Sequence, residues 1–424
     1  MVERRLLLVG ICIALAAMTL LPLRYQRYQI ATGSMAPTLL GEHRRCACSR
    51  CGSPVVVGSA APDCFKAHCP NCGHSDLPLA QAPDQPGDVV SVDRWAYSLA
   101  SPKRWDVVLF QRGEESWVKR IAGLPGETVE IRDGDVWIDG VRSRKSFGEL
   151  PSMQQELFDD AYSPHGIDAS RRWERDPRGE LVGGRPMLDG RDGSQTWIYA
   201  RFLFDERQYR PFVDEYAYEG SSRADAEPVH DFIADLDLTV LHADGNLRVA
   251  LTDGSDVIEA SISLTNAGSL KVRTRPDSFE GKEAPALKLS TVRMTPWRGG
   301  ETRRVTVAFV DRRFHIACDG QPIGDAIDLP DAASREPVVR PLRLTIERGC
   351  VRVDRFRLSR DVHYRPQGMA GQAVRLGSGE YFVLGDHSPV AEDSRTWLDP
   401  AIRRRDLLGR VLDLKRPRSF GAPN

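Results

Sequence analysis

Neither sign of charge dominates this sequence, and that absence limits its possible partners. The 424 residues include 58 lysines and arginines against 59 aspartates and glutamates, which gives a formal net charge of −1 at pH 7. Proteins that bind nucleic acids usually carry a net basic charge or a concentrated basic stripe. The charge balance therefore predicts that no nucleic acid is a partner.

Long uncharged apolar runs are also scarce, and the negative mean hydropathy excludes a bundle of many membrane-spanning helices. One run, residues 6–23, contains no charged residue. It has about the minimum length that crosses a bilayer as a helix. We therefore expect a transmembrane anchor over residues 5–24, flanked on both sides by arginines that do not fix its orientation. The alternative is a cleaved export signal ending near Ala14-Leu15-Ala16, but the apolar run continues beyond that point.

Cysteine is sparse outside one short segment, since six of the nine cysteines lie between residues 46 and 72. Two Cys-x-x-Cys pairs within it, each followed by glycine, have the spacing of a zinc ribbon. The pairs are Cys48 with Cys51 and Cys69 with Cys72. We therefore predict a zinc ribbon over residues 42–80 with these four cysteines as ligands. Four protein ligands leave no open position, so the zinc is expected to be structural. Disulfides are the alternative if the segment lies in an oxidising space, with Cys46, Cys64, His43, His68 and His74 as partners or bystanders.

Most of the remaining sequence predicts β structure. Residues 87–145 alternate apolar and polar positions and contain Asp133-Gly134 and Asp139-Gly140, which are typical of tight hairpin turns. We expect one antiparallel sheet there, within a segment spanning 84–150. After residue 146 about 80 residues show no clear period.

A second β pattern begins near residue 231 and predicts an inserted β-sandwich. Its strands are separated by Asp-Gly and Arg-Gly turns. This pattern resembles concanavalin- or laminin-G-like jelly rolls, and it places a sandwich from about 195–231 to 362 within an inserted region, 151–365. Such a module can bind a glycan or a protein, or it can be purely structural.

Three short segments carry the residue types that acyl transfer needs: T-G-S-M-A-P-T-L at 32–39, V-K-R-I-A-G-L-P-G-E at 118–127, and Y-F-V-L-G-D-H-S-P-V-A-E-D-S-R at 381–395. Gly33 lets the backbone expose the hydroxyl of Ser34. Lys119 can act as a base only if burial depresses its pKa, and Val118, Ile121 and Trp117 are suitable neighbours. The guanidinium of Arg120 does not deprotonate, so it cannot be the base.

The order and content of these segments resemble type I signal peptidase, a membrane protease that removes secretion signals. The resemblance implies that Ser34 is the nucleophile, that Lys119 is the base, and that Thr32 and the Ser34 amide form the oxyanion hole. It implies no cofactor for catalysis. It also implies an antiparallel β catalytic core assembled from residues 25–41, 84–150 and 366–418. The loop that supports the active site would contain Gly385, Asp386, Asp393, Ser394 and Arg395.

The third segment departs from the family pattern in two places. Many relatives have Asn-Arg where this chain has His387-Ser388, and they have a serine that orients the lysine where this chain has Ala391. Ser388, Ser394 or a water molecule can take over that role. His387 can also be considered as a base, but a structural hydrogen-bonding role fits a histidine in an asparagine's place better.

The resemblance further implies a location and partners. The chain is expected to span the cell membrane once, with a cytoplasmic N-terminus and its catalytic domain on the outer, periplasmic face, with the bilayer and exported preproteins as partners. One competing interpretation is a related Ser-Lys protease that cleaves itself or one partner. Another is a catalytically weak or silent membrane protein whose β-sandwich binds a glycan or protein at the cell surface.

Overall fold

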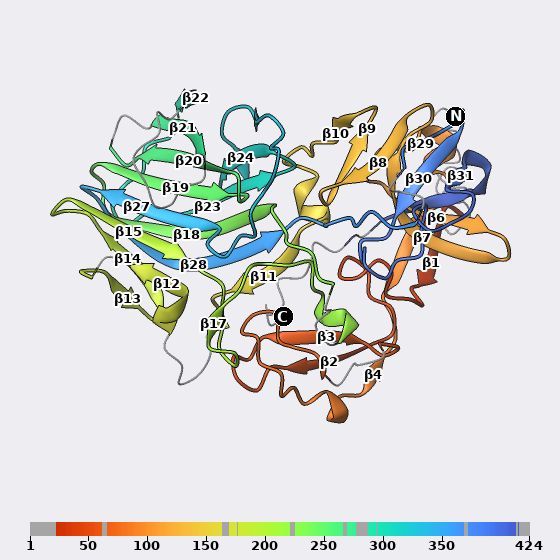
Figure 1. Ribbon diagram of the computed structural model, residues 1–424, viewed down its shortest axis with the longest axis horizontal. Helices are drawn as coiled ribbons and strands as arrows, with labels where there is room; N and C mark the ends of the chain where they lie inside the picture. The colour runs from red at the N-terminus through yellow and green to blue at the C-terminus, as the bar shows by residue number, and fades with distance from the viewer. Residues whose placement is uncertain are drawn as a thin grey trace, which may run out of the picture. The chain divides into compact units, whose positions relative to one another are not determined.

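The computed structural model describes residues 23–61, 66–162, 169–175, 177–220, 225–265, 269–276, 287–293, 295–368, 372–412 and 414 (Figure 1). Nearly all regular structure in these residues is β, which confirms the predicted class. The expected anchor, 5–24, lies outside the described residues except for its last two positions. No helix within the described part is long and apolar enough to cross a membrane.

The chain divides into two compact units, each built from segments that are distant in sequence. The first unit contains residues 1–43, 84–143 and 364–416. Its larger sheet has seven strands. In spatial order these are β1 (Tyr25–Gln29), β5 (Val89–Asp93), β32 (Leu407–Val411), β6 (Val107–Arg112), β7 (Glu115–Gly123), β30 (Glu380–Leu384) and β31 (Ala401–Arg403).

A second, four-stranded sheet completes the first unit, in the order β10 (Val141–Arg142), β9 (Asp135–Ile138), β8 (Thr128–Arg132) and β29 (Val374–Arg375). The expected single sheet over 87–145 is therefore divided between two sheets. The predicted hairpin turns are confirmed: Asp133-Gly134 joins β8 to β9, and Asp139-Gly140 joins β9 to β10. All four turn residues have positive φ, the conformation that two-residue hairpins of type I′ require.

Alternation along β6 explains why the larger sheet is covered on both faces. Val107 and Leu109 belong to one apolar cluster, together with Met35 and Leu39. The intervening Val108 and Phe110 belong to another, which includes apolar residues of β7 and β30. Short helices in the first unit are α2 (Ala96–Leu99) and η7 (Arg404–Asp406).

The second unit, residues 44–83, 144–363 and 417–424, contains a sandwich of two antiparallel sheets (Figure 1). One sheet follows the order β13 (Glu180–Val182), β14 (Arg185–Asp189), β28 (Cys350–Arg360), β18 (Phe232–His242), β23 (Thr302–Val310), β24 (Arg313–Cys318) and β25 (Gln321–Pro322). In addition, β11 (Gln155–Asp159) pairs with β28, and β26 (Ile327–Asp328) pairs with β24.

The other sheet follows the order β12 (Trp173–Arg175), β15 (Ser194–Tyr199), β27 (Leu342–Glu347), β19 (Asn246–Thr252), β20 (Asp256–Ser263), β21 (Ser269–Pro276) and β22 (Leu287–Arg293). A single apolar core includes side chains from both sheets, such as Leu236 of β18 and Leu344 of β27. The strands β11 to β15 precede or overlap the expected start of the sandwich at about 195–231. These strands are short. In addition, β11 and β14 pair with β28, and β15 pairs with β27, which lie far along the chain, so local sequence gave little sign of them.

The cysteine segment belongs to the second unit and carries little regular structure. Its strands are β2 (His43–Ala47) and β3 (Pro54–Gly58), and the first cysteine pair lies in the turn between them. The remaining short elements are η2 (Leu79–Gln81), β4 (Asp84–Gln85), η3 (Leu150–Ser152), η4 (Ala169–Arg172), β16 (Phe202–Leu203), β17 (Gln208–Tyr209) and η5 (Ala217–Glu219).

Candidate functional site

Ser34 and Lys119 lie together in the first unit, although 85 positions separate them. The distance from Lys119 Nζ to Ser34 Oγ is 2.6 Å, which is within hydrogen-bond range. Ser34 is in the turn after β1, where the Ala36 amide donates to the Gly33 carbonyl. Lys119 is on β7, opposite Val108 of β6. The pair therefore joins a loop to a central strand of the seven-stranded sheet.

Lys119 is almost completely buried, with 1% of its surface exposed. Burial lowers its pKa to about 8, because the protonated amine loses hydration. The carboxylates of Asp393, Glu392 and Asp386 act in the opposite direction, and their effect is smaller than that of burial. A substantial fraction of this amine is therefore neutral near pH 8 and can accept a proton.

Thr32 completes the group of polar atoms around Ser34. Its Oγ1 atom lies 3.4 Å from Ser34 Oγ, and its side chain is exposed. A hydroxyl beside the nucleophile can donate a hydrogen bond to an oxygen that becomes negatively charged during acyl transfer. The structure thus brings together Ser34, Lys119 and Thr32.

Asp386 connects the three sequence segments. Arg120, the residue after Lys119, donates to it from Nε at 2.8 Å and from Nη2 at 2.6 Å. Thr38, from the serine segment, donates to Asp386 Oδ2 at 2.5 Å. The Arg120 and Asp386 side chains are both fully buried. A buried carboxylate needs such partners, so Arg120 serves as its counter-ion.

A second buried ion pair shapes the rest of the loop. Arg395 contacts both carboxylate oxygens of Asp393, from Nε at 2.9 Å and from Nη2 at 2.7 Å. Asp393 in turn accepts a hydrogen bond of 2.9 Å from the Gly385 amide. A Cβ atom on Gly385 would lie 2.5 Å from the Ser34 carbonyl oxygen, so the loop passes too close to Ser34 for a side chain at this position.

His387 and the serines of this loop have structural partners. The His387 amide donates to the Ser34 carbonyl at 3.1 Å, and its Nδ1 donates to the Gly33 carbonyl at 3.1 Å. Ser388 Oγ accepts hydrogen bonds from the Arg365 amide and from Arg395. Ser394 Oγ accepts one from the Val383 amide. Among the described residues, neither serine hydroxyl contacts Lys119, so neither replaces the hydroxyl that Ala391 lacks.

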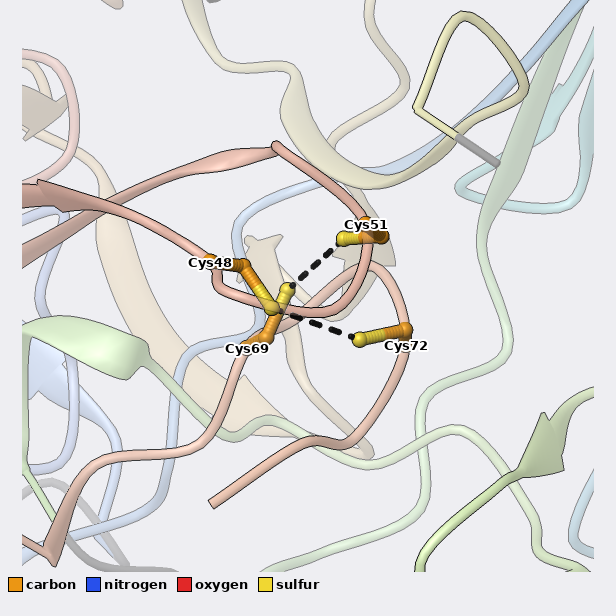
Figure 2. A group of neighbouring side chains, drawn as sticks. All are labelled: Cys48, Cys51, Cys69 and Cys72. Atoms are coloured by element: carbon orange, nitrogen blue, oxygen red, sulfur yellow. Dashed lines mark hydrogen bonds between the residues drawn. The ribbon is translucent and has the colours of Figure 1, made fainter. Parts of the chain in front are cut away.

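The cysteine segment brings its two pairs into one cluster (Figure 2). The sulfurs of Cys48 and Cys72 are 3.6 Å apart, as are those of Cys51 and Cys69, and all four sulfurs lie within 4.8 Å of one another. Tetrahedral zinc with Zn–S bonds of about 2.3 Å would place its sulfurs about 3.8 Å apart. The four cysteines are buried free thiols, so the expected alternative of disulfides among them does not occur in this structure. The cluster can hold a metal ion.

Asn71 anchors this cluster within the second unit. Its Nδ2 donates to the Tyr162 carbonyl at 2.7 Å, and its Oδ1 accepts from the Asp159 amide at 2.8 Å. The same Nδ2 lies 3.9 Å from the sulfur of Cys51. One side chain therefore links the second cysteine pair to the end of β11.

Sequence reasoning did not assign roles to Thr38, Arg365 and Asn71. Thr38 belongs to the serine segment and Asn71 lies between two cysteines, so each stood inside a recognised motif. Nothing local in the sequence indicated their partners, which are far along the chain. Arg365 contributes backbone atoms: its amide donates to Ser388 Oγ, and its carbonyl accepts from Arg395. Almost any residue type can make such contacts, so the sequence does not reveal them.

Comparisons with known proteins point to one protease family for part of the chain. Residues 80–173 match the family described as "Signal peptidase, peptidase S26". This segment contains Lys119, whereas Ser34 and the loop 385–395 lie outside it.

Two relatives are signal peptidases by name. Signal peptidase I of Leptolyngbya laminosa is 31% identical over 78 residues, which is 16% of this chain and 38% of the relative. Probable signal peptidase I-2 of Synechocystis sp. is 26% identical over 116 residues, 23% of this chain and 53% of the relative. The chain thus spans about half, or less, of the length of these relatives.

Solved structures give a weaker likeness. A Bacillus subtilis protein of unknown function with a galectin-like fold has a TM-score of 0.32 and 11% identity, covering 53% of this chain and all of that one. A TM-score this low supports no argument about function.

Proposed function

We propose that this chain is a membrane-anchored serine endopeptidase that removes N-terminal signal peptides from exported preproteins. The observation that carries the proposal is the 2.6 Å approach of a buried lysine amine to a serine hydroxyl. The similarity of residues 80–173 to the signal peptidase family supports the same reaction class.

The proposed mechanism uses three side chains. Lys119 accepts the proton of the Ser34 hydroxyl, and Ser34 Oγ forms a bond to the carbonyl carbon of the scissile peptide. Thr32 Oγ1 and the Ser34 amide stabilise the negative oxygen. The lysine ammonium then donates its proton to the departing amine. Water releases the acyl group from Ser34, with Lys119 again as the base.

Substitution of each reacting residue tests this mechanism. Ser34→Ala and Lys119→Ala are expected to abolish cleavage of a purified preprotein. Ser116→Ala and Lys103→Ala are matched controls, because both side chains are exposed in the same unit, and they should cleave at the wild-type rate. Normal cleavage by Lys119→Ala would refute the Ser-Lys mechanism.

An inhibitor distinguishes the protease from a catalytically silent protein. An acylating penem-type inhibitor should add its mass to Ser34 in the wild-type protein and add nothing to the Ser34→Ala variant. Absence of labelling in a folded wild-type protein would favour the silent alternative, in which the β-sandwich binds a glycan or protein.

The proposed location places the N-terminus in the cytoplasm and both units on the outer face of the cell membrane. Family resemblance supports this arrangement, because signal peptides emerge on that face. External protease should digest the chain in spheroplasts, while a cytoplasmic marker protein in the same cells stays intact. Protection of the chain until the cells are lysed would contradict the topology.

We also propose that Cys48, Cys51, Cys69 and Cys72 hold a structural zinc ion. The spacing of the sulfurs and the all-thiolate donor set support this assignment. Metal analysis of the purified chain should find one zinc per molecule. A metal-free protein without free thiols in this segment would refute the ribbon.

A further inference from the structure

Lys145 makes a buried contact with two carboxylates of the second unit. Its Nζ atom is 2.6 Å from Asp361 Oδ2, and it donates to both carboxylate oxygens of Asp311 at 3.0 Å. All three side chains are at most 3% exposed. One ammonium group cannot neutralise two carboxylates. The fully ionised cluster would therefore keep an uncompensated negative charge away from water, which is costly.

The fold holds the main chain of Lys145 and the turn that carries Asp311. The Lys145 amide donates to Asp311 Oδ2 at 3.0 Å, and the Lys145 carbonyl accepts from His315 Nε2 at 3.1 Å. Asp311 lies in the turn between β23 and β24, where the next residue, Arg312, donates to Asp253 at 2.7 Å. The amine is therefore kept in contact with this carboxylate by several bonds that do not involve Nζ.

The carboxyl group of Asp361, which directly follows β28, has a different environment. Both of its oxygens are buried, and within the described residues they accept no hydrogen bond of regular geometry. Burial raises the pKa of Asp361, because the charged form loses hydration. The charge of Lys145 opposes this effect, whereas the charges of Asp311 and Asp231 add to it. Asp361 is therefore the member of the cluster that takes the neutral acid form.

We propose that Lys145 and Asp361 condense after folding into an intramolecular amide bond, with Asp311 transferring the proton. The bond joins the beginning of the segment 144–363, the main part of the second unit, to its end. It replaces buried ions with a neutral amide, which removes the cost of the uncompensated charge. The inference does not rest on the proposed Ser34–Lys119 reaction.

The step uses the three side chains alone and releases water. Burial acts to lower the pKa of Lys145, but Asp311 and Asp361 together raise it, so the amine starts protonated and needs a base. Asp311 takes a proton from the ammonium group, and the neutral Nζ atom forms a bond to Cγ of the protonated Asp361. The bond from Cγ to the hydroxyl oxygen breaks. A second amine proton reaches this oxygen through Asp311, and water leaves. Asp311 ends as a neutral acid.

Mass spectrometry of the purified full-length chain tests the inference. A tryptic digest should contain a branched peptide in which Lys145 is joined to Asp361, lighter by one water molecule than its two linear parts together. Recovery of both residues in linear peptides of unchanged mass would overturn the inference. A loss of water confined to a linear peptide, as in a succinimide at an Asp-Gly sequence, would overturn it too. So would a branched peptide that joins Lys145 to Asp311.

Two variants separate the amide bond from a simple ion pair. Lys145→Arg keeps a buried positive charge, but its guanidinium does not deprotonate and cannot form the amide. Asp311→Asn removes the proton acceptor. Neither variant should yield the branched peptide, and its presence in Asp311→Asn would overturn the role of Asp311. If either variant does not fold, the digest of the wild-type chain still decides.

Two further variants serve as controls. Lys271→Ala removes an exposed lysine of the same unit and should leave the branched peptide in place. Ser34→Ala should retain it as well, because the bond forms without the proposed protease chemistry. Loss of the branched peptide in Ser34→Ala would overturn the inference. A Ser34→Ala chain that carries the bond but cleaves preproteins normally would instead refute the proposed function alone.

Discussion

Thr38 Oγ1 donates a hydrogen bond of 2.5 Å to Asp386 Oδ2, although 348 positions separate the two residues. The bond joins the segment that carries Ser34 to the loop at 385–395. Arg120 binds the same carboxylate from the lysine segment. One buried aspartate therefore fixes the relative positions of all three segments of the candidate active site.

Asp386→Ala should destabilise the protein strongly, because it leaves the Arg120 guanidinium buried without its counter-ion. The expected loss in the free energy of unfolding is about 3–5 kcal/mol, measured by urea denaturation. Arg375→Ala is the control, since its side chain is 69% exposed. It loses surface contacts alone, a hydrogen bond of 3.1 Å to Thr128 Oγ1 and an ion pair of 3.5 Å with Asp139. Its effect should stay below about 1 kcal/mol. Equal losses of unfolding free energy in the two variants would show that Asp386 does not hold the three segments together.

Cleavage activity should rise with pH and reach half its maximum near pH 8. The reason is that burial lowers the pKa of Lys119 to about 8 and the neutral amine is the base in the proposed reaction. The measurement is kcat/KM between pH 6 and 10 on one preprotein. A profile that stays flat across this range would contradict Lys119 as the base.

Lys119 should also make stability depend on pH. Its pKa is lower in the folded protein than the ordinary value of 10.5, so the unfolded chain binds more protons between about pH 8 and 10.5. Stability from this group therefore rises with pH across that window, and the cost of burying the amine is largest below pH 8. Lys119→Met should accordingly stabilise the protein at pH 7, by up to about 3 kcal/mol, and gain less at pH 10. A variant destabilised equally at both pH values would contradict this.

His387→Ala should slow cleavage about tenfold, because the ring no longer holds the Gly33 carbonyl beside the nucleophile. His387→Asn retains a side-chain donor and should keep more activity. The pH at half-maximal activity should not move in either variant. A shift in that pH would mean that the imidazole takes part in proton transfer.

Removal of one cysteine from the cluster should release the metal and loosen the segment around it. Cys72→Ser is expected to lower zinc content from one per chain to near zero and to increase protease cleavage in residues 44–83. Cys46→Ser is the control, since Cys46 lies outside the four-sulfur group. Retention of stoichiometric zinc by Cys72→Ser would refute the proposed ligand set.

Asn71→Ala tests how the cluster is attached to its unit. It removes the hydrogen bonds to Tyr162 and Asp159 while leaving all four sulfurs in place. Zinc content should stay at one per chain, while amide hydrogen exchange at the end of β11 becomes faster. Unchanged exchange there would show that Asn71 does not anchor the cluster.

The β class and the Asp-Gly hairpins were predictable because their causes are local. Asp133-Gly134 and Asp139-Gly140 adopt positive φ, which aspartate and glycine tolerate better than most residues. The division of residues 87–145 between two sheets was not predictable. It depends on pairing with β30 and β32 in one sheet and with β29 in the other, and these strands come from the C-terminal part of the chain.

The sequence by itself determined the chemical groups at both sites: a serine after glycine, a lysine that only burial can activate, and two Cys-x-x-Cys pairs with glycine turns. Only the tertiary structure decided that Lys119 is buried, that it meets Ser34 across 85 positions, and that Asp386 joins three distant segments. The reason is that the lowered pKa of Lys119 and the buried Arg120–Asp386 ion pair arise from packing between segments that are distant in sequence. Local sequence does not specify which of these segments pack together.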